Sequence, residues 1–317
     1  MVSNTRRTKS SSSAAAAPRG GRAAAPAPAP DLAAGGPSLR WSVEQRLAFV
    51  DERLFWLGEV NRTDLVRRFG ISMSQASGDI ARYLARNPPG VSYDKSAKRY
   101  VADAGFAPVL AAPDATRLLG ELRLVELGSI VVEDTMLGIL PPFAGAPLPA
   151  RPVDPRVLRA VWHAIRDHLA LSVKYQSMSR PMATRRIVAP HALAHDGFRW
   201  HVRAHDRETG TFRDFVLGRL SDPEPAGAAD MRPDDDIDWH TIVKLVIAPH
   251  PGLTPAQAKA IAIDYGIKGK TATIPVRRAL LFYALKRLGL DVPPDTRPPH
   301  EQHIVLVNRE AVQRALA

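Results

Sequence analysis

Residues 61–100 read NRTDLVRRFGISMSQASGDIARYLARNPPGVSYDKSAKRY, and this stretch decides the fold of the first domain. Gly70 permits a sharp chain reversal between two helical segments, because glycine adopts the left-handed conformation without steric cost. Ser72 is suited to cap the second of these helices, and the Asn-Pro-Pro-Gly run at 87–90 ends it. The sequence therefore predicts two helices joined by a tight turn.

The segments on either side complete a familiar layout. Upstream, apolar residues recur at three- and four-residue spacing along an amphipathic helix that Gly58 ends: Leu47, Val50, Leu54 and Leu57. Downstream, strand-like runs at 91–94 and 99–101 flank a basic turn at 95–98. Three helices followed by a β-hairpin form a winged helix-turn-helix domain, which we place at residues 38–106.

The third helix of this layout is the candidate DNA-reading element. Its outward, N-terminal part carries short polar side chains: Ser72, Ser74, Gln75 and Ser77. Short side chains let a helix enter the major groove, and a glutamine can pair bidentately with adenine. Further basic residues suit the DNA backbone: Arg82 on the helix, and Lys95, Lys98 and Arg99 on the hairpin. The combination favours DNA binding over an ordinary packing unit with a solvated polar face.

The charge of the chain is concentrated in a few segments. The 317 residues include 43 Lys and Arg against 32 Asp and Glu, and residues 151–220 alone hold 13 basic and 6 acidic side chains. A local basic excess indicates a polyanionic partner, although biased arginine usage would give the same composition. Residues 1–37 combine a basic cluster with Ser, Ala and Pro runs, which predicts a disordered basic arm and not a secretory signal.

Composition and motifs argue against several other classes of protein. The absence of cysteine excludes a disulfide framework, an iron–sulfur site and a thiol nucleophile, and no apolar run reaches the roughly 18 residues of a membrane span, so we expect a cytoplasmic protein. Gly269-Lys270-Thr271 resembles the end of a phosphate-binding loop, but Asp264 stands where its first glycine should be. We expect no catalytic residues, no cofactor and no enzyme; a histidine-dependent hydrolase is a third hypothesis.

The rest of the chain divides into three segments. Residues 107–150 read as a connecting helix capped by Asp114 and a proline-rich linker. Residues 151–222 combine one helix with about four strand-like runs, which predicts a compact twisted sheet or small barrel. Residues 237–317 alternate strands and helices and are charge-neutral, which favours a packing or dimerisation module.

The middle segment contains the most informative alternation. Asp196-Gly197 favours a two-residue hairpin turn, which would pair His195 with Phe198 and Leu193 with Trp200. The apolar face of the hairpin then carries Leu193, Phe198, Trp200 and Val202, and the polar face carries Arg199, His201, Arg203 and His205. With Arg213 and Arg219 nearby, the polar face would form a basic concave surface for phosphate or nucleotide, or else the solvated face of an antiparallel sheet.

Two clusters invite a metal interpretation. Four histidines lie close in sequence, at His191, His195, His201 and His205. The predicted register places His191 and His201 on opposite faces with no carboxylate at ligand spacing, so we expect no metal site unless a bulge changes the register. The aspartates at 234–236 with Asp238 and His240 could bind a cation, but a solvated acidic loop is the stronger expectation.

The order of these motifs resembles the WYL-domain transcriptional regulators of bacteria, and most closely the CapW- and BrxR-like repressors of phage-defence operons. The resemblance covers about residues 40–317. It is carried by the winged helix and by four later runs: Val173-Lys174-Tyr175, RRIVAPH at 185–191, FRWHVRA at 198–204 and FRDFVLGRL at 212–220. The naming triplet differs, because Trp200-His201-Val202 stands where Trp-Tyr-Leu is typical, which leaves the ligand's identity open.

The resemblance implies an α+β multidomain protein with an N-terminal winged helix-turn-helix, a central SH3-like small β-barrel (the WYL domain) and a C-terminal α/β dimerisation domain. It implies a homodimer that binds a double-stranded DNA operator with an inverted repeat and senses a small anionic ligand, a nucleotide or nucleic-acid fragment. The expected ligand-binding residues are Tyr175, Ser177, Arg186, His191, Trp200, His201, Arg203, Arg213 and Arg219. The alternative is a nucleic-acid-binding adaptor that docks to an effector enzyme without operator specificity.

Overall fold

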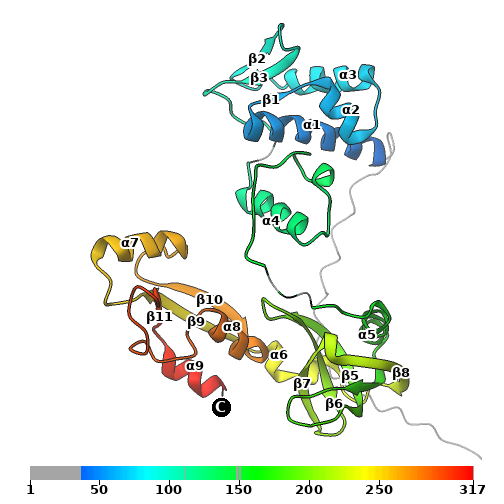
Figure 1. The fold of residues 1–317 in the computed structure, drawn as a ribbon, viewed down its shortest axis with the longest axis vertical. Coiled ribbons are helices and arrows are strands. Elements are labelled where there is room, and N and C mark those ends of the chain that lie inside the picture. The colour runs from blue at the N-terminus through cyan, green and yellow to red at the C-terminus, as the bar shows by residue number, and fades with distance from the viewer. Residues whose placement is uncertain (1–36, 111, 148, 150, 317) are drawn as a thin grey trace, which may run out of the picture. The chain divides into compact units, whose positions relative to one another are not determined.

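The computed structural model describes residues 37–110, 112–147, 149 and 151–316 (Figure 1). The arm predicted at 1–37 lies almost entirely outside these residues. Contacts within the chain divide it into two compact units, residues 1–147 and 148–317.

The first unit contains the predicted helices and hairpin. The three antiparallel strands form one sheet in the order β1-β3-β2, and the short strand β1 was not predicted. The elements are α1 (Pro37–Leu57), β1 (Glu59–Val60), α2 (Arg62–Phe69), α3 (Met73–Leu84), β2 (Val91–Asp94) and β3 (Arg99–Ala102).

Local signals explain where these helices begin and end. Asn61 caps α2 through a capping box with Asp64, and Gly70 ends it with a φ of +63° while its N–H donates to the carbonyl of Val66. Ser72 caps α3 in the same way with Gln75. The helices enclose a core that includes Leu54, Leu65, Ile80 and Tyr83.

The segment after the hairpin packs on the winged helix and is not a plain linker. Helix α4 (Ala115–Glu126) begins at the predicted cap Asp114. A 3₁₀ turn (Val132–Asp134) follows, and Arg53 of α1 donates through Nη1 to the carbonyl of Leu137 at 2.6 Å. Arg68 of α2 donates to the carbonyls of Glu133 and Asp134, so two arginines fasten this segment to the first domain.

The second unit begins with α5 and a five-stranded antiparallel sheet in the order β7-β6-β5-β4-β8 (Figure 1). Helix α5 packs Val157, Val161 and Ala164 onto one face of the sheet. The elements are α5 (Pro155–Asp167), β4 (Leu169–Tyr175), β5 (Thr184–His195), β6 (Trp200–Asp206), β7 (Thr211–Val216), a 3₁₀ turn (Leu217–Arg219) and β8 (Leu220–Ala228).

Strand β8 and the shape of the sheet differ from the expectations. Pro223 and Pro225 disguise β8 in the sequence, and both are tolerated because β8 is an edge strand. Among the described residues no ladder joins β7 to β8, so the sheet is open and the predicted small barrel is not closed.

The predicted hairpin register is wrong by two residues. His195 pairs with Trp200 and Leu193 with Val202, so the connection spans 196–199. The Oδ1 atom of Asp196 accepts the N–H groups of both Phe198 and Arg199, which stabilises this longer turn. Phe198 lies in this turn, and both Phe198 and Trp200 are exposed and outside the core. A bulge between Pro190 and Ala192 contains His191.

The C-terminal part of the second unit has a three-stranded sheet in the order β10-β9-β11, with a core that includes Leu245, Ile247, Leu281 and Ile304. Its elements are a 3₁₀ turn (Pro233–Asp235), α6 (Ile237–His240), β9 (Ile242–Pro249), α7 (Pro255–Asp264), β10 (Ala272–Arg277), a 3₁₀ turn (Arg278–Leu280), α8 (Leu281–Arg287), β11 (Ile304–Leu306) and α9 (Arg309–Leu316). No helix in the described part of the chain has both the length and the apolarity to cross a membrane.

Candidate nucleic-acid interface and ligand site

Helix α3 presents its N-terminal turn to solvent. Its opposite face is buried through Ala76, Ile80 and Tyr83, which fixes the rotation of the helix. The exposed residues of the first turn are Ser72, Met73, Ser74 and Gln75, and Ser77 is half-buried. The structure thus brings together the four polar residues predicted to face DNA.

Hydrogen bonds within the turn orient two of these side chains. The Oε1 atom of Gln75 accepts the backbone N–H of Ser72 at 3.2 Å, and Ser72 Oγ accepts the N–H of Gln75 at 3.1 Å. Ser77 Oγ donates to the carbonyl of Met73 at 2.9 Å. Within the described residues the amide Nε2 of Gln75 has no hydrogen-bond partner, so its donor is available to a base edge.

Met73 is a surface residue that the sequence interpretation passed over. It is the first residue of α3 and is 47% exposed. The only signal for it is that an apolar side chain interrupts a run of serines. An exposed apolar group at this position suits contact with a thymine methyl group.

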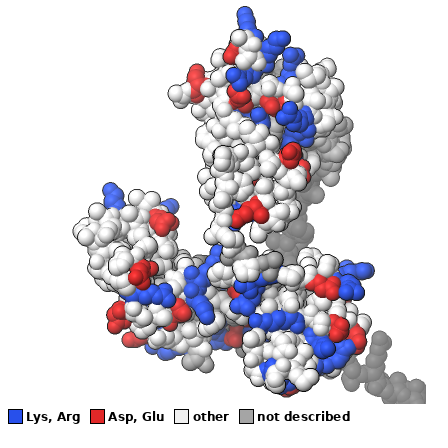
Figure 2. All heavy atoms as spheres, in the orientation of Figure 1, with Lys and Arg blue, Asp and Glu red and all other residues white. Residues whose placement is uncertain are grey.

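The basic residues predicted to contact the DNA backbone differ in their partners. Arg82 pairs with Asp79 at 3.2 Å, and Arg99 pairs with Glu59 at 2.5 Å. Lys95 and Lys98 are exposed at the hairpin tip, and within the described ranges neither forms an ion pair. Figure 2 shows Lys and Arg atoms gathered at the end of the unit that carries β2 and β3. The two lysines are therefore the available cations of the wing.

In the second unit, strand β6 is buried on both faces. Val202 and Ala204 pack against the α5 side, while His201, Arg203 and His205 are buried on the other side. The C-terminal part of the unit supplies carboxylates and an aromatic ring to this second face. The predicted polar face is therefore neither an open basic surface nor a solvated one.

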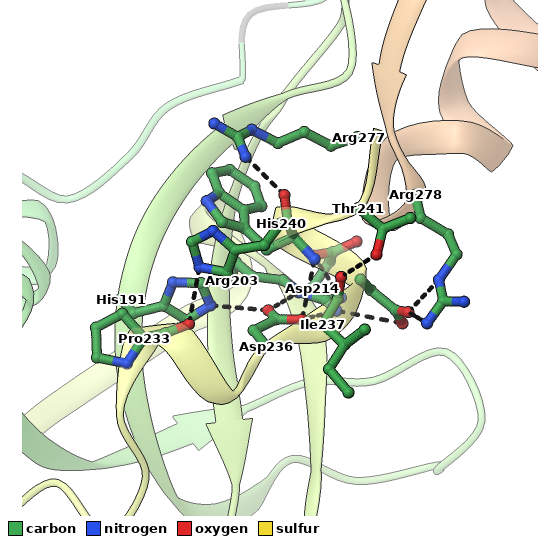
Figure 3. A network of polar contacts seen from close by, with 12 residues as sticks. His191, Arg203, Asp214, Pro233, Asp236, Ile237, His240, Thr241, Arg277 and Arg278 are labelled. Carbon is green, nitrogen blue, oxygen red and sulfur yellow. Dashed lines mark hydrogen bonds and ion pairs between the residues drawn. The ribbon is translucent and has the colours of Figure 1, made fainter. Parts of the chain in front are cut away.

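Arg203 lies at the centre of a polar network (Figure 3). It is 5% exposed and donates from Nε and Nη2 to the two carboxylate oxygens of Asp236, at 2.7 and 3.0 Å. Its Nη1 donates to Asp214 at 3.2 Å, and His191 Nε2 lies 2.9 Å from Asp236 Oδ2. Asp236 is 1% exposed, so the expectation of a solvated acidic loop at 234–236 is wrong for this residue.

The protonation states in this network follow from burial and charge. Burial acts to raise the pKa of Asp236, but the hydrogen bonds and charge of Arg203 outweigh it and hold that pKa below its ordinary value. Burial lowers the pKa of His191, more than its contact with Asp236 raises it. His191 is therefore neutral at pH 7, and we assign its Nε2 as the proton donor to Asp236.

His201, the residue at the centre of the naming triplet, is enclosed in a second contact set. It is 3% exposed, its Nε2 lies 2.9 Å from Asp196 Oδ2, and its ring lies 4.9 Å from the ring of Tyr283 in α8. Tyr283 donates its hydroxyl to Asp214 at 3.2 Å. In the described ranges no three His, Asp or Glu side chains are grouped as a metal would need.

The other predicted ligand residues lie apart from these. Arg186 is buried against Asp206 at 2.6 Å, with Arg213 at 4.0 Å from the same carboxylate. Tyr175 is a core residue that stacks edge-on against Phe215. Ser177 lies in a loop and contacts Ser179. The nine residues therefore do not converge on one site.

Two of the nine, Trp200 and Arg219, line a cavity on the surface of this unit. The cavity has a volume of about 230 Å³, and Trp200 is 50% exposed. Arg199, which the sequence placed on the predicted polar face, also lines the cavity. The sequence interpretation missed the other residues of its wall: Arg151, Pro152, Val153, Val216 and Gly218. An exposed indole beside three guanidinium groups suits a ligand with a flat ring and an anionic group.

Comparison with known proteins agrees with this architecture. Residues 42–124 match the family described as BrxR transcriptional regulator winged helix-turn-helix domain, residues 156–225 the WYL domain, and residues 242–312 the BrxR transcriptional regulator C-terminal dimerization domain. The DNA-binding transcriptional repressor CapW of Stenotrophomonas maltophilia is 36% identical over 283 residues, which cover 88% of this chain and 94% of that protein. The chain belongs to the CapW and BrxR family of transcriptional regulators.

A second member of the family gives the same picture. The DNA-binding transcriptional repressor CapW of Pseudomonas aeruginosa is 37% identical over 279 residues, covering 88% of this chain and 93% of that protein. Among solved structures, proteasome accessory factor B/C (PafBC) of Arthrobacter aurescens is 16% identical over 89% of this chain and 54% of its own, with a TM-score of 0.24. The predicted winged helix, WYL domain and C-terminal dimerisation domain are confirmed by the family matches.

Proposed function

We propose that this protein is a homodimeric transcriptional repressor that reads its operator with α3. The observation that carries the proposal is the first turn of α3, which is fixed by a buried opposite face and exposes Ser72, Ser74 and Gln75. Lys95 and Lys98 at the hairpin tip supply backbone contacts. The relatives named as DNA-binding transcriptional repressors support the same function.

A dimer requires a symmetric operator. The match of residues 242–312 to a dimerization domain supports a homodimer, whose two α3 helices would contact two half-sites of an inverted repeat. As further parts of the proposal, the protein acts in the cytoplasm, and the operon that it controls is a phage-defence operon. Inspection of the genes beside the coding sequence tests the last point.

The WYL domain is proposed to sense an anionic ligand, a nucleotide or nucleic-acid fragment. The cavity beside Trp200 supports this, because Arg151 and Arg219 line it and neither is in an ion pair with another described residue. Bound ligand would change operator affinity only if it binds one dimer geometry better than another. The proposal also includes the domain boundaries: a winged helix at 38–106, a connecting segment at 107–150, a WYL domain at 151–222 and a dimerisation domain at 237–317.

Operator binding is tested with DNA from upstream of the gene. Fluorescence anisotropy at fixed salt should show binding at least about a thousandfold tighter than to a scrambled duplex, as is typical of specific DNA-binding proteins. Multi-angle light scattering on the same sample should give the mass of a dimer. Equal affinity for both duplexes would refute the repressor function and leave the adaptor hypothesis.

Ligand sensing is tested separately at the cavity. Trp200→Ala should retain operator affinity and lose response to nucleoside monophosphates, cyclic dinucleotides and short single-stranded oligonucleotides, tried as a panel. Phe198→Ala is the matched control, because Phe198 is an exposed aromatic two residues before Trp200 and is not among the residues that line the cavity. Equal response in both variants and the wild type would contradict the assignment of the cavity.

A further inference from the structure

The network around Arg203 has the geometry of an anion-binding site. A guanidinium fork grips two oxygens of one carboxylate, and the His191 Nε2 and the backbone N–H of Trp239 complete the set around Asp236. Arg203 and His191 belong to strands β6 and β5 of the WYL sheet. The carboxylate that they bind, Asp236, lies outside this sheet, in the segment that follows it and 33 residues after Arg203.

The charges around the site are balanced. The charged groups that face it are Arg203, Arg277 and Arg278 on one side and Asp214, Asp236 and Asp238 on the other, with His191, His240 and Tyr283 nearby. Another carboxylate or a phosphate monoanion in place of Asp236 would leave this balance unchanged. A neutral ligand would leave Arg203 with one carboxylate fewer, at high cost for a buried cation.

Asp236 also connects the WYL sheet to the C-terminal part of the unit (Figure 3). It caps α6, where Asp238 pairs with Arg278 and the carbonyl of Trp239 accepts from Arg277 at 2.6 Å. Arg277 also lies over the Trp239 ring at 4.6 Å. Movement of Asp236 out of the arginine fork would therefore disturb the start of β9 and the turn after β10.

We propose that Arg203 and His191 form an anion-binding site that Asp236 occupies as an internal ligand, and that an anionic effector with a carboxylate or phosphate group competes with Asp236 for this site. The effector's role in regulation rests on the proposed function, whereas the site itself can be tested without DNA. When the effector displaces Asp236, the contacts between the WYL sheet and the part of the chain that matches a dimerization domain would loosen.

The test uses the full chain with Asp236→Ala, which removes one carboxylate and leaves space for formate. Melting curves in sodium formate are compared with curves in sodium chloride of equal ionic strength, and sodium phosphate is run as a second probe that separates carboxylate from phosphate recognition. At about ten times its dissociation constant, formate should raise the melting temperature of this variant by about 3–5 °C. The wild type should respond by less than about 1 °C.

The double variant Arg203→Gln with Asp236→Ala is the matched control. It lacks both charges of the pair and should show no formate effect, which separates binding at Arg203 from general salt effects. Calorimetry should also find that Asp236→Ala binds the probe at least about tenfold more tightly than the wild type, since the internal competitor is gone.

Two results would overturn the proposal: equal formate effects in the single and double variants, or no anion-specific effect in Asp236→Ala. If that variant is unfolded in chloride, refolding in formate must restore it, and failure to do so overturns the proposal as well. Operator binding of the wild type in chloride is measured in parallel. If the wild type in chloride binds its operator no better than scrambled DNA, the proposed function is refuted and the anion-site result is unaffected.

Discussion

Replacing Gln75 with alanine separates the capping contact that the structure shows from the base contact that we propose. Its Oε1 atom accepts the N–H of Ser72, and its Nε2 atom donates to none of the described residues. Both residues are exposed, so water can replace the lost contact, and the cost in stability should be about 0.5 kcal/mol. The second hydrogen bond of the capping box survives, because it uses the backbone N–H of residue 75.

The effect on DNA should be larger and confined to the operator. Loss of a glutamine that contacts a base costs about 1–3 kcal/mol of discrimination, which is about five- to 150-fold in affinity. Scrambled DNA should be bound almost as well as before, since its affinity comes from phosphate contacts. Anisotropy titrations of both duplexes at the same salt concentration measure the two effects side by side.

Gln75→Glu provides the matched control. A glutamate keeps an acceptor for Ser72 at the third helical position and places a negative charge at a helix N-terminus, so stability should be equal or slightly higher. That charge repels phosphate, so affinity should fall on both duplexes. If alanine weakens operator and scrambled DNA equally, Gln75 does not read sequence and the reasoning is wrong.

Three further predictions concern charge and packing. The melting temperature should fall as the pH is lowered from about 7.5 to about 5.5. Burial holds the pKa of His191 in the folded protein below the ordinary 6.5, so the unfolded chain binds the proton at a higher pH than the folded chain does. His191→Gln should flatten this part of the profile. Tyr83→Phe should cost about 1–2 kcal/mol in urea denaturation, since the buried hydroxyl donates to Asp51 at 2.5 Å, and an unchanged midpoint would contradict this. Lys95→Ala and Lys98→Ala should each reduce the slope of log affinity against log salt by about 0.9, and an unchanged slope would show that the wing does not contact phosphate.

Short-range signals made the first domain predictable. A glycine with positive φ at Gly70 and capping boxes at Asn61 and Ser72 act within three residues, so the sequence displays them directly. The hairpin at Asp196 also depends on a local contact, but the sequence does not show which of two possible turns forms there. Its carboxylate accepts two N–H groups and lengthens the turn, and this competes with the two-residue turn that Asp-Gly favours.

The ligand region was less predictable because its contacts are long-range. Three aspartates in succession at 234–236 look alike in sequence, and only Asp236 is buried. What distinguishes it is an arginine on a strand far away in the chain, and the four-residue helix α6 is too short for any periodicity. Likewise, alternation along β6 cannot reveal which face is solvated when both faces are buried.

The basic excess of residues 151–220 also has a different meaning once partners are known. Arg203 pairs with Asp236, Arg207 with Asp230 and Arg185 with Glu224, so carboxylates that follow residue 220 neutralise part of the excess. The two proposals give an anion two alternative sites in this unit. It would bind at the cavity lined by Arg151 and Arg219, or it would displace Asp236 from Arg203. Binding at the first site would need no rearrangement, whereas binding at the second would be coupled to the position of Asp236. The second site would therefore give the WYL sheet a direct means of moving the C-terminal part of the unit.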